Sequence, residues 1–169
     1  MAKREIVKIG ADILSKKSAP IQAIDEDIRA LARDMLETMH AAPGIGLSAP
    51  QVNAGVRLIT VDLSIGENPD DVHVLINPVI TGQEGSCVRE EGCLSVPETF
   101  EKVTRPQKIT VRCLDLEGRE KIIEAQDLLA RVFCHEIDHL DGKLFIDRLS
   151  PLKRSLIRKK FKKEAAQKA

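Results

Sequence analysis

The chain has 169 residues and a mass of 18.7 kDa, a size typical of a single domain. Its hydrophobic fraction of 43% and charged fraction of 31% exclude a disordered or a fibrous protein. The net charge of +0 excludes a uniformly basic nucleic-acid-binding protein. The lack of Trp and Tyr argues against an aromatic platform for single-stranded nucleic acid.

The sequence contains no apolar stretch near the roughly 18 residues that a membrane-spanning helix needs. The basic residues near the N-terminus are not followed by the uninterrupted apolar segment of a signal peptide. We therefore expect no membrane association and either a cytoplasmic location or the mature form of an imported protein. In such a reducing compartment the four cysteines are expected to be buried thiols, metal ligands or nucleophiles rather than disulfides.

The first predicted element is a helix from about Asp25 to His40. Apolar residues recur there at helical spacing, Asp25 or Asp27 can cap its start, and Pro43 with Gly44 ends it. The next segment, residues 44–51, is predicted to be a turn punctuated by Gly and Pro.

Six short segments rich in β-forming residues come next, separated by turn signals such as those at residues 66–69 and 117–118. They are residues 57–63, 73–80, 87–96, 102–105, 108–114 and 120–124. Short connections between them predict antiparallel pairing, because parallel strands need long crossovers.

Two further helices are predicted toward the C-terminus. One runs from about Asp127, a plausible cap, to Leu140, with Gly142 at the position of a C-terminal glycine. Apolar residues, among them Leu128, indicate that this helix is internal. The other follows Pro151 and runs to the terminus. A helix, then strands, then helices predict an α+β fold.

The internal helix contains the motif His135-Glu136-Ile137-Asp138-His139. Residues at positions i and i+4 are neighbours on one face of a helix, so both imidazoles can reach one cation, and Glu136 can reach a water bound to it. A catalytic site of this kind needs a third protein ligand. Cys93 is the best candidate, because its thiolate is a strong ligand and Gly92 allows close backbone approach. Glu164, His40 and His73 are weaker candidates.

Three separated motifs give the chain a resemblance to the peptide deformylase family. They are Gly44-Ile45-Gly46-Leu47-Ser48-Ala49-Pro50-Gln51, Glu91-Gly92-Cys93-Leu94-Ser95 and the His135–His139 motif, in the family's order. The resemblance implies hydrolytic removal of the formyl group from the N-terminal formylmethionine of nascent polypeptides. It also implies one divalent metal, Fe²⁺ in the cell with Zn²⁺, Ni²⁺ or Co²⁺ as alternatives.

The resemblance also assigns roles to residues. Metal-bound water attacks the formyl carbon, and Glu136 acts as general base and then acid. The Gln51 side chain and the Leu94 N–H stabilise the developing oxyanion. The methionine side chain and the peptide backbone are expected to contact Ile45, Gly46, Gly92, Leu128 and Val132.

The expected fold is therefore α+β, with antiparallel β-sheets packed around a central metal-binding helix and with an N-terminal and a C-terminal helix. Residues 1–150 form the catalytic domain, and residues 151–169 form a basic C-terminal helix or tail. Asp138 and Arg105 are expected to form structural ion pairs.

Two residues depart from the family's common pattern, Ser48 where alanine is usual and Cys134 where glutamine is usual. We expect Ser48 to change little. We expect Cys134 to be a buried apolar thiol, like Cys87 and Cys113.

Two alternatives remain open. A zinc endopeptidase would use the same helix with a downstream ligand such as Glu164. A non-catalytic protein would hold a structural metal, which needs four protein ligands, and would bind RNA through its basic tail.

The zero net charge conceals an uneven distribution. Residues 151–169 hold eight basic residues against Glu164 alone, so the preceding 150 residues carry 18 basic and 25 acidic groups. Such asymmetry is typical of a protein with a polyanionic partner. For an enzyme acting on nascent chains, this predicts that the basic helix docks on the ribosome, without sequence-specific nucleic-acid binding.

Overall fold

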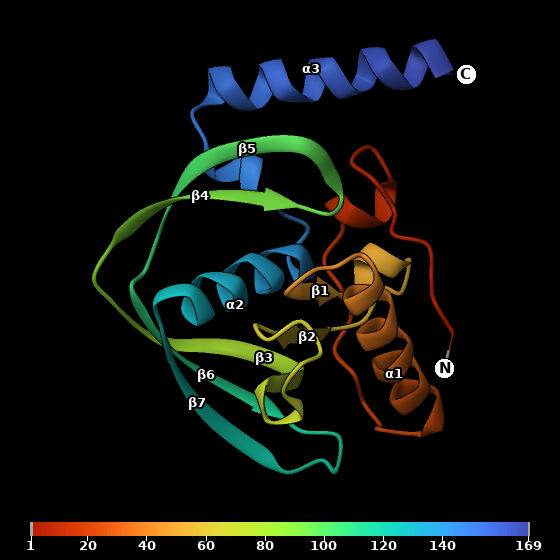
Figure 1. The fold of residues 1–169 in the computed structure, drawn as a ribbon, viewed down its shortest axis with the longest axis vertical. Coiled ribbons are helices and arrows are strands. Elements are labelled where there is room, and N and C mark those ends of the chain that lie inside the picture. The colour runs from red at the N-terminus through yellow and green to blue at the C-terminus, as the bar shows by residue number, and fades with distance from the viewer. Residues whose placement is uncertain (1, 169) are drawn as a thin grey trace.

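A computed structural model describes residues 2–168 of the chain (Figure 1). Its helices and strands, in chain order, are α1 (Glu26–Ala41), β1 (Gly46–Ser48), β2 (Leu58–Asp62), β3 (Val72–Glu84), β4 (Cys87–Cys93), β5 (Val96–Arg105), β6 (Lys108–Leu114), β7 (Glu120–Gln126), α2 (Asp127–Leu140) and α3 (Pro151–Lys168). A short 3-10 helix, Ala49–Val52, follows β1 directly.

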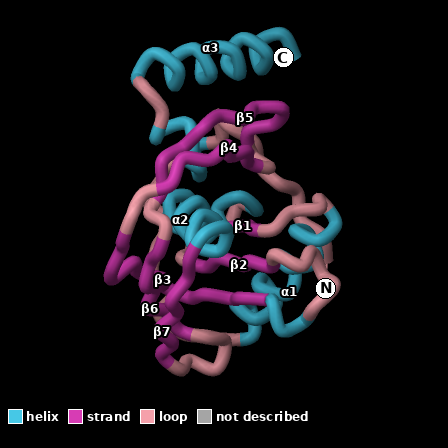
Figure 2. The backbone as a smooth tube through the Cα atoms, turned by 60° about the vertical axis from the view of Figure 1, so that its left-hand side comes forward, coloured by secondary structure: helices cyan, strands magenta, loops and turns pink. Residues whose placement is uncertain are grey.

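The strands form two antiparallel sheets. The larger sheet has the order β1-β2-β3-β6-β7, and the smaller one is the β4–β5 hairpin. Helix α2 lies between the hairpin and the larger sheet, while α1 lies to one side and α3 runs over the hairpin (Figures 1 and 2). This arrangement confirms the predicted α+β fold with antiparallel sheets around a central helix.

Helix α2 is surrounded by protein over most of its length. Every residue from 130 to 140 is buried, and Phe133 and Leu140 are completely inaccessible to solvent. Phe133 and Ile137 pack against side chains of the larger sheet, including Val61 and Val111. A helix that is buried on several sides can hold polar side chains only where they find hydrogen-bond partners. The buried histidines and carboxylates of α2 therefore need partners.

The ends of the helices agree only partly with prediction. Asp25 caps α1 as predicted, its carboxylate accepting a 3.0 Å hydrogen bond from the Ile28 N–H. Gly142 adopts a positive φ of 77° after α2, in a conformation that favours glycine. Asp127 was wrongly predicted as a cap: it is the first residue of α2, and Gln126 precedes it as the N-cap.

Two strand predictions and one turn prediction differ from the structure. The predicted strand 87–96 is two strands, because the chain turns sharply after Cys93 and Val96 pairs back with Cys93. The second strand of that hairpin therefore begins at Val96, before the predicted residues 102–105. Residues 46–48 of the predicted turn form β1, which pairs with β2 and so places this segment against α2.

Helix α3 contacts the rest of the chain through one side. Ile157 and Phe161 pack on the cluster that contains Val96, Val103 and Phe145, whereas Leu152 and Leu156 point to solvent and are 69% and 58% exposed. Among residues 2–168, none of the helices has both the length and the apolar character that crossing a membrane requires.

Candidate active site

The three predicted metal ligands come together at one point of the fold. Cys93 is the last residue of β4, and His135 and His139 lie one turn apart on α2. Their ligand atoms all lie within 4.8 Å of one another. The Nε2 atom of His139 is 3.3 Å from Nε2 of His135 and 3.4 Å from Sγ of Cys93.

These separations suit a single small cation. Metal–nitrogen bonds of about 2.0–2.1 Å and a metal–sulfur bond of about 2.3 Å in tetrahedral geometry place the donor atoms roughly 3.3–3.6 Å apart. Burial, with neighbouring His135 and Arg105, holds the pKa of His139 well below its usual value. A neutral imidazole is the form that binds a metal.

The ring of His135 is oriented by Glu91, two residues before Cys93 on β4. Oε1 of Glu91 lies 3.0 Å from Nδ1 of His135, which leaves Nε2 of His135 facing Cys93 and His139. Burial opposes ionisation of Glu91, but hydrogen bonds from Arg105 and His135 outweigh it and lower the pKa of Glu91 to about 2. A carboxylate behind a ligating histidine fixes its tautomer and raises its basicity.

Two arginines complete this buried network. Arg105 donates two hydrogen bonds of 2.9 Å to Glu91 and one of 2.6 Å to Asp138, so the predicted structural ion pair is present. Arg131 of α2 also pairs with Glu91 and donates to the Val103 carbonyl at 2.9 Å. Removing water from these charges costs free energy that only such complete pairing offsets.

Glu136 lies on the other side of His135 and has a different environment. Its Oε2 atom is 4.0 Å from Nε2 of His135, and its Oε1 atom is buried without a hydrogen-bond partner. Burial raises the pKa of Glu136 to about 7. A methyl group on Gly46 would lie 2.6 Å from Oε2 of Glu136, so glycine is required at that point of β1. Such a carboxyl group can both accept and donate a proton near neutral pH.

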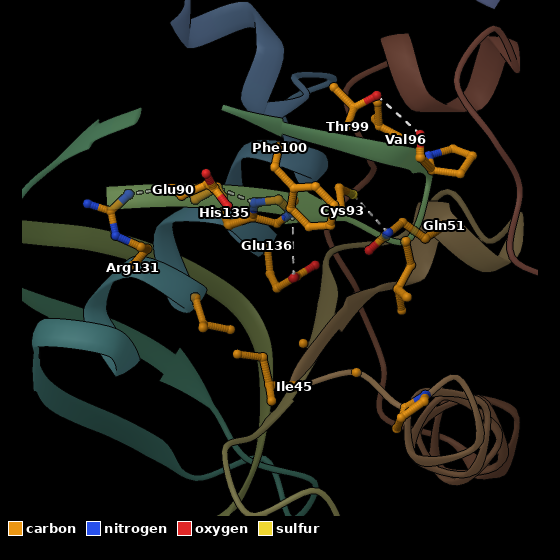
Figure 3. Close-up of a pocket in the computed structure, with 18 of the residues that line it drawn as sticks. Ile45, Gln51, Glu90, Cys93, Val96, Thr99, Phe100, Arg131, His135 and Glu136 are labelled. Atoms are coloured by element: carbon orange, nitrogen blue, oxygen red, sulfur yellow. Dashed lines mark hydrogen bonds and ion pairs between the residues drawn. The ribbon is translucent and has the colours of Figure 1, made fainter. Parts of the chain in front are cut away.

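Gln51 is completely enclosed and held at both ends of its amide. Oε1 accepts hydrogen bonds from the Ser48 N–H at 3.0 Å and from the Ser48 hydroxyl at 3.1 Å. Nε2 donates to Oγ of Ser95 at 3.1 Å. It also approaches Sγ of Cys93 at 3.5 Å (Figure 3). The amide therefore presents an N–H to the region around Cys93. Ser48, expected to matter little, makes a direct contact with this side chain.

A pocket of about 510 Å³ opens beside the donor atoms. Its walls include Cys93, His135, Glu136, Gln51 and Leu94, together with the five residues predicted to contact a substrate, Ile45, Gly46, Gly92, Leu128 and Val132. His139 lies deeper and is 1% exposed. The sequence therefore predicted which residues meet here.

Leu128 occupies a different environment from the predicted one. It was expected to face the core as part of an internal helix, but it is 52% exposed at the first turn of α2, where it lines the pocket. Phe100, which sequence reasoning missed, also lines the pocket and covers Gly92, where a methyl group would lie 2.6 Å from its ring. Nothing in the sequence marked this aromatic residue, because it lies after the motif, between the predicted strands 87–96 and 102–105.

The remaining candidates lie elsewhere. Cys134 and Cys113 are buried, and burial raises the pKa of each thiol to about 11, as expected for apolar filling rather than metal binding. Cys87 is only partly buried. His40 pairs with Asp62 at 2.7 Å, and the ring of His73 packs edge-on against Phe133. Within residues 2–168, the group of potential ligands around Cys93 does not include Glu164.

The sequence matches the family model described as polypeptide deformylase over residues 3–155. The chain belongs to the peptide deformylase family. A peptide deformylase of Nitrosococcus oceani is 53% identical over 150 residues, which are 89% of each chain. One of Acidobacterium capsulatum is 49% identical over 160 residues, covering 95% of this chain and 94% of the other.

Solved structures of the family share the fold. A peptide deformylase from Legionella pneumophila, 41% identical, matches with a TM-score of 0.89 over 99% of this chain and 100% of that one. A plant peptide deformylase, 33% identical, matches with a TM-score of 0.91 over 98% of this chain and 92% of that one. Peptide deformylases are metal-dependent hydrolases that act on formylated nascent peptides, so this chain is an enzyme of that class.

Proposed function

We propose that this chain hydrolyses the formyl group from the N-terminal formylmethionine of nascent polypeptides, in the pocket between β1, β4 and α2. The observation that carries the proposal is the convergence of Cys93, His135 and His139 beside Glu136, whose free carboxylate oxygen faces no protein partner. Nascent formylated chains occur where ribosomes translate, so the proposal includes a cytoplasmic location.

In this proposal Cys93, His135 and His139 hold one divalent metal ion. When bound, the cation would acidify a water molecule and polarise the formyl oxygen. A donor set of one thiolate and two imidazoles accepts Fe²⁺, Zn²⁺, Ni²⁺ and Co²⁺, and the choice of Fe²⁺ follows the family resemblance. Glu91 holds His135 in the ligating orientation from 3.0 Å.

Glu136 moves the proton in two steps. It takes a proton from the attacking water as the oxygen–carbon bond forms, and it delivers that proton to the peptide nitrogen as the carbon–nitrogen bond breaks. The products are formate and a free N-terminal amine. A pKa of about 7 supports both roles, because neither protonation state is then strongly disfavoured near neutral pH.

Gln51 and Leu94 stabilise the negative charge that develops on the formyl oxygen. The Gln51 amide is already oriented by Ser48 and Ser95, so it loses little freedom during the reaction. Leu94 lies in the turn that follows Cys93 and lines the same pocket, and its backbone N–H is the proposed second donor.

Ile45, Leu128 and Val132 form the apolar slot for the methionine side chain. The peptide backbone passes Gly46 and Gly92, where it can pair as an added strand. The structure gives these glycines a further reason to lack side chains, since a methyl group would meet Glu136 at Gly46 and Phe100 at Gly92.

Replacing Cys93 tests the ligand set. We expect the Cys93→Ala variant to lose stoichiometric metal and formate-releasing activity, while the Cys113→Ala variant, which alters a buried thiol away from the pocket, keeps both. Metal content by atomic absorption and formate release from a formyl-Met peptide measure the two effects. A Cys93→Ala protein that retains full metal and activity would contradict the proposal and favour a ligand set such as that of a zinc endopeptidase.

We also propose that α3 docks the enzyme on the ribosome. The helix carries all eight basic residues of 151–169, and its side chains at Lys159, Lys160 and Lys163 are exposed. Ile157 and Phe161 attach the helix to the body. Lys153 and Arg158 also pair with carboxylates of the body, whereas Lys159, Lys160 and Lys163 face solvent. A polyanionic RNA surface is the partner that such a helix fits.

A further inference from the structure

The N-terminal segment crosses the molecule close to the proposed oxyanion site. Residues 2–9 have no helix or strand of their own. The Ala2 N–H and the Arg4 side chain bind Asp34 of α1, at 2.8 Å and 3.0 Å. The chain then leaves α1 and reaches the two segments that carry Gln51 and Leu94. We call residues 6–9 the N-terminal strap.

The strap makes three hydrogen bonds to those two segments. The Val7 N–H donates to the Gln51 carbonyl at 2.8 Å, and the Ile9 N–H donates to the Ser95 carbonyl at 2.8 Å. Between them, the Lys8 ammonium donates to the Leu94 carbonyl at 3.0 Å. In extended chain, N–H groups two residues apart point the same way, so one short segment can span two partners.

Side chains of the strap enter two different clusters of the core. Ile6 packs in the cluster that contains Leu47, Val52 and α1, and Ile9 packs in the cluster that contains Val96 and Phe145. The first cluster supports the segment of Gln51, and the second supports the β4–β5 hairpin. The strap therefore joins the segment of Gln51 to the β4–β5 hairpin. Gln51 and Cys93, which belong to these two parts, are 42 residues apart in sequence.

We infer that the strap is a positioning element that sets the distance between the two oxyanion donors. Hydrogen bonds that stabilise a transition state require accurate placement, and an error of about 1 Å can cost roughly 100-fold in rate. Besides the strap, the turn at Leu94 and Ser95 is tied to the Gln51 segment by the side-chain bond from Gln51 to Ser95 and by the packing of Leu94 on the cluster that contains Leu47 and Val52. The inference rests on the proposed roles of Gln51 and Leu94.

The first variant to test is Lys8→Met, because Lys8 is exposed and its loss leaves the core unchanged. Lys3→Met, a change at another exposed lysine of the same segment, is the matched control. Val7→Pro and Ile9→Pro each remove one backbone donor. We expect kcat for a formyl-Met peptide to fall about 3- to 30-fold in the three strap variants, with KM and metal content unchanged and Lys3→Met like the parent.

Hydrogen exchange adds a measurement that does not depend on activity. Amide exchange in the turn at residues 94–95 should quicken in Lys8→Met and Ile9→Pro, while exchange in α2 stays as in the parent. Equal exchange and equal kcat in the strap variants and the parent would overturn the inference. A parent protein without turnover would instead contradict the proposed function, so the two failures are distinguishable.

A double-mutant cycle with Gln51→Ala separates positioning from general weakening of the fold. If Val7 acts by positioning the side-chain amide of Gln51, Val7→Pro should change kcat less than about twofold in the Gln51→Ala background, where that side-chain amide is absent. An equal loss of kcat in both backgrounds, or a Gln51→Ala variant with parental kcat, would overturn the inference.

Discussion

Two carboxylates flank the ring of His135, and their pKa values are shifted in opposite directions. Glu91 receives hydrogen bonds from Arg105, Arg131 and His135. Those from Arg105 and His135 lower its pKa to about 2 despite burial. Glu136 has no comparable partner, and burial raises its pKa to about 7. In the proposed mechanism, Glu91 stays ionised and orients His135, and Glu136 is the carboxyl group that transfers protons. Paired groups whose environments separate their pKa values are typical of active sites.

The Glu136→Gln variant tests that division of roles. The amide keeps the size of the side chain but cannot transfer a proton, so we expect kcat for deformylation to fall about 100- to 10,000-fold. Metal content should be unchanged, because Glu136 lies outside the group of Cys93, His135 and His139. Formate release and atomic absorption measure the two quantities. Parental activity in this variant would rule out Glu136 as the proton carrier.

At the scale of elements, prediction succeeded where local sequence determines the result. The bounds of α2 follow from its apolar spacing and from Gly142, and those of β6 from its alternation. The turn after Cys93 was missed because its residues, Leu94 and Ser95, are neither Gly nor Pro. The sequence there gives no signal that a strand ends. The motifs singled out Cys93, His135 and His139, which the structure brings together, but the Glu91 network was not predictable, since its partners lie 14 to 44 residues away.

Asp62, the last residue of β2, links that strand to α1. Its buried carboxylate accepts hydrogen bonds from the Ser64 N–H and hydroxyl, the Gly66 N–H and His40. Burial alone would raise the pKa of Asp62, but these bonds lower it from 3.8 to about 2. Because the folded-state pKa is lowered, the ionised group stabilises the fold above pH 3.8, and this contribution disappears as the pH falls through about 2.

We therefore expect Asp62→Asn to lower the free energy of unfolding by about 2 kcal/mol near pH 7. The difference between the parent and this variant should shrink steadily between about pH 4 and pH 2. Urea unfolding of both proteins at a series of pH values measures this difference in the free energy of unfolding. Asp70→Asn, at an exposed aspartate of the next loop, is the control. A difference that stays constant from pH 7 to pH 2 would contradict this account of Asp62.

At the scale of the whole molecule, charge is separated between body and tail. The first 150 residues have an excess of acidic groups, and α3 has a matching excess of basic ones, so the net charge of zero conceals a strong dipole. The acidic body would be repelled by RNA and the basic helix attracted to it. Docking through α3 would therefore orient the enzyme as well as bind it.

Charge reversal on α3 tests the docking without disturbing its packing. Lys159→Glu, Lys160→Glu and Lys163→Glu alter exposed side chains and leave Ile157 and Phe161 in place. We expect this triple variant to lose co-sedimentation with ribosomes at low salt, with turnover of a formyl-Met dipeptide nearly unchanged. The matched control reverses exposed Lys3, Lys16 and Lys17. Equal co-sedimentation of both triple variants would rule out a specific role for α3.

The most direct test of the central claim is formate release from a formyl-Met dipeptide by protein purified without oxygen and supplied with Fe²⁺. We predict stoichiometric formate and free methionyl dipeptide, no cleavage of the following peptide bond, and loss of turnover in Glu136→Gln. No release of formate with Fe²⁺, Co²⁺, Ni²⁺ or Zn²⁺ bound, or release that persists in Glu136→Gln, would contradict it.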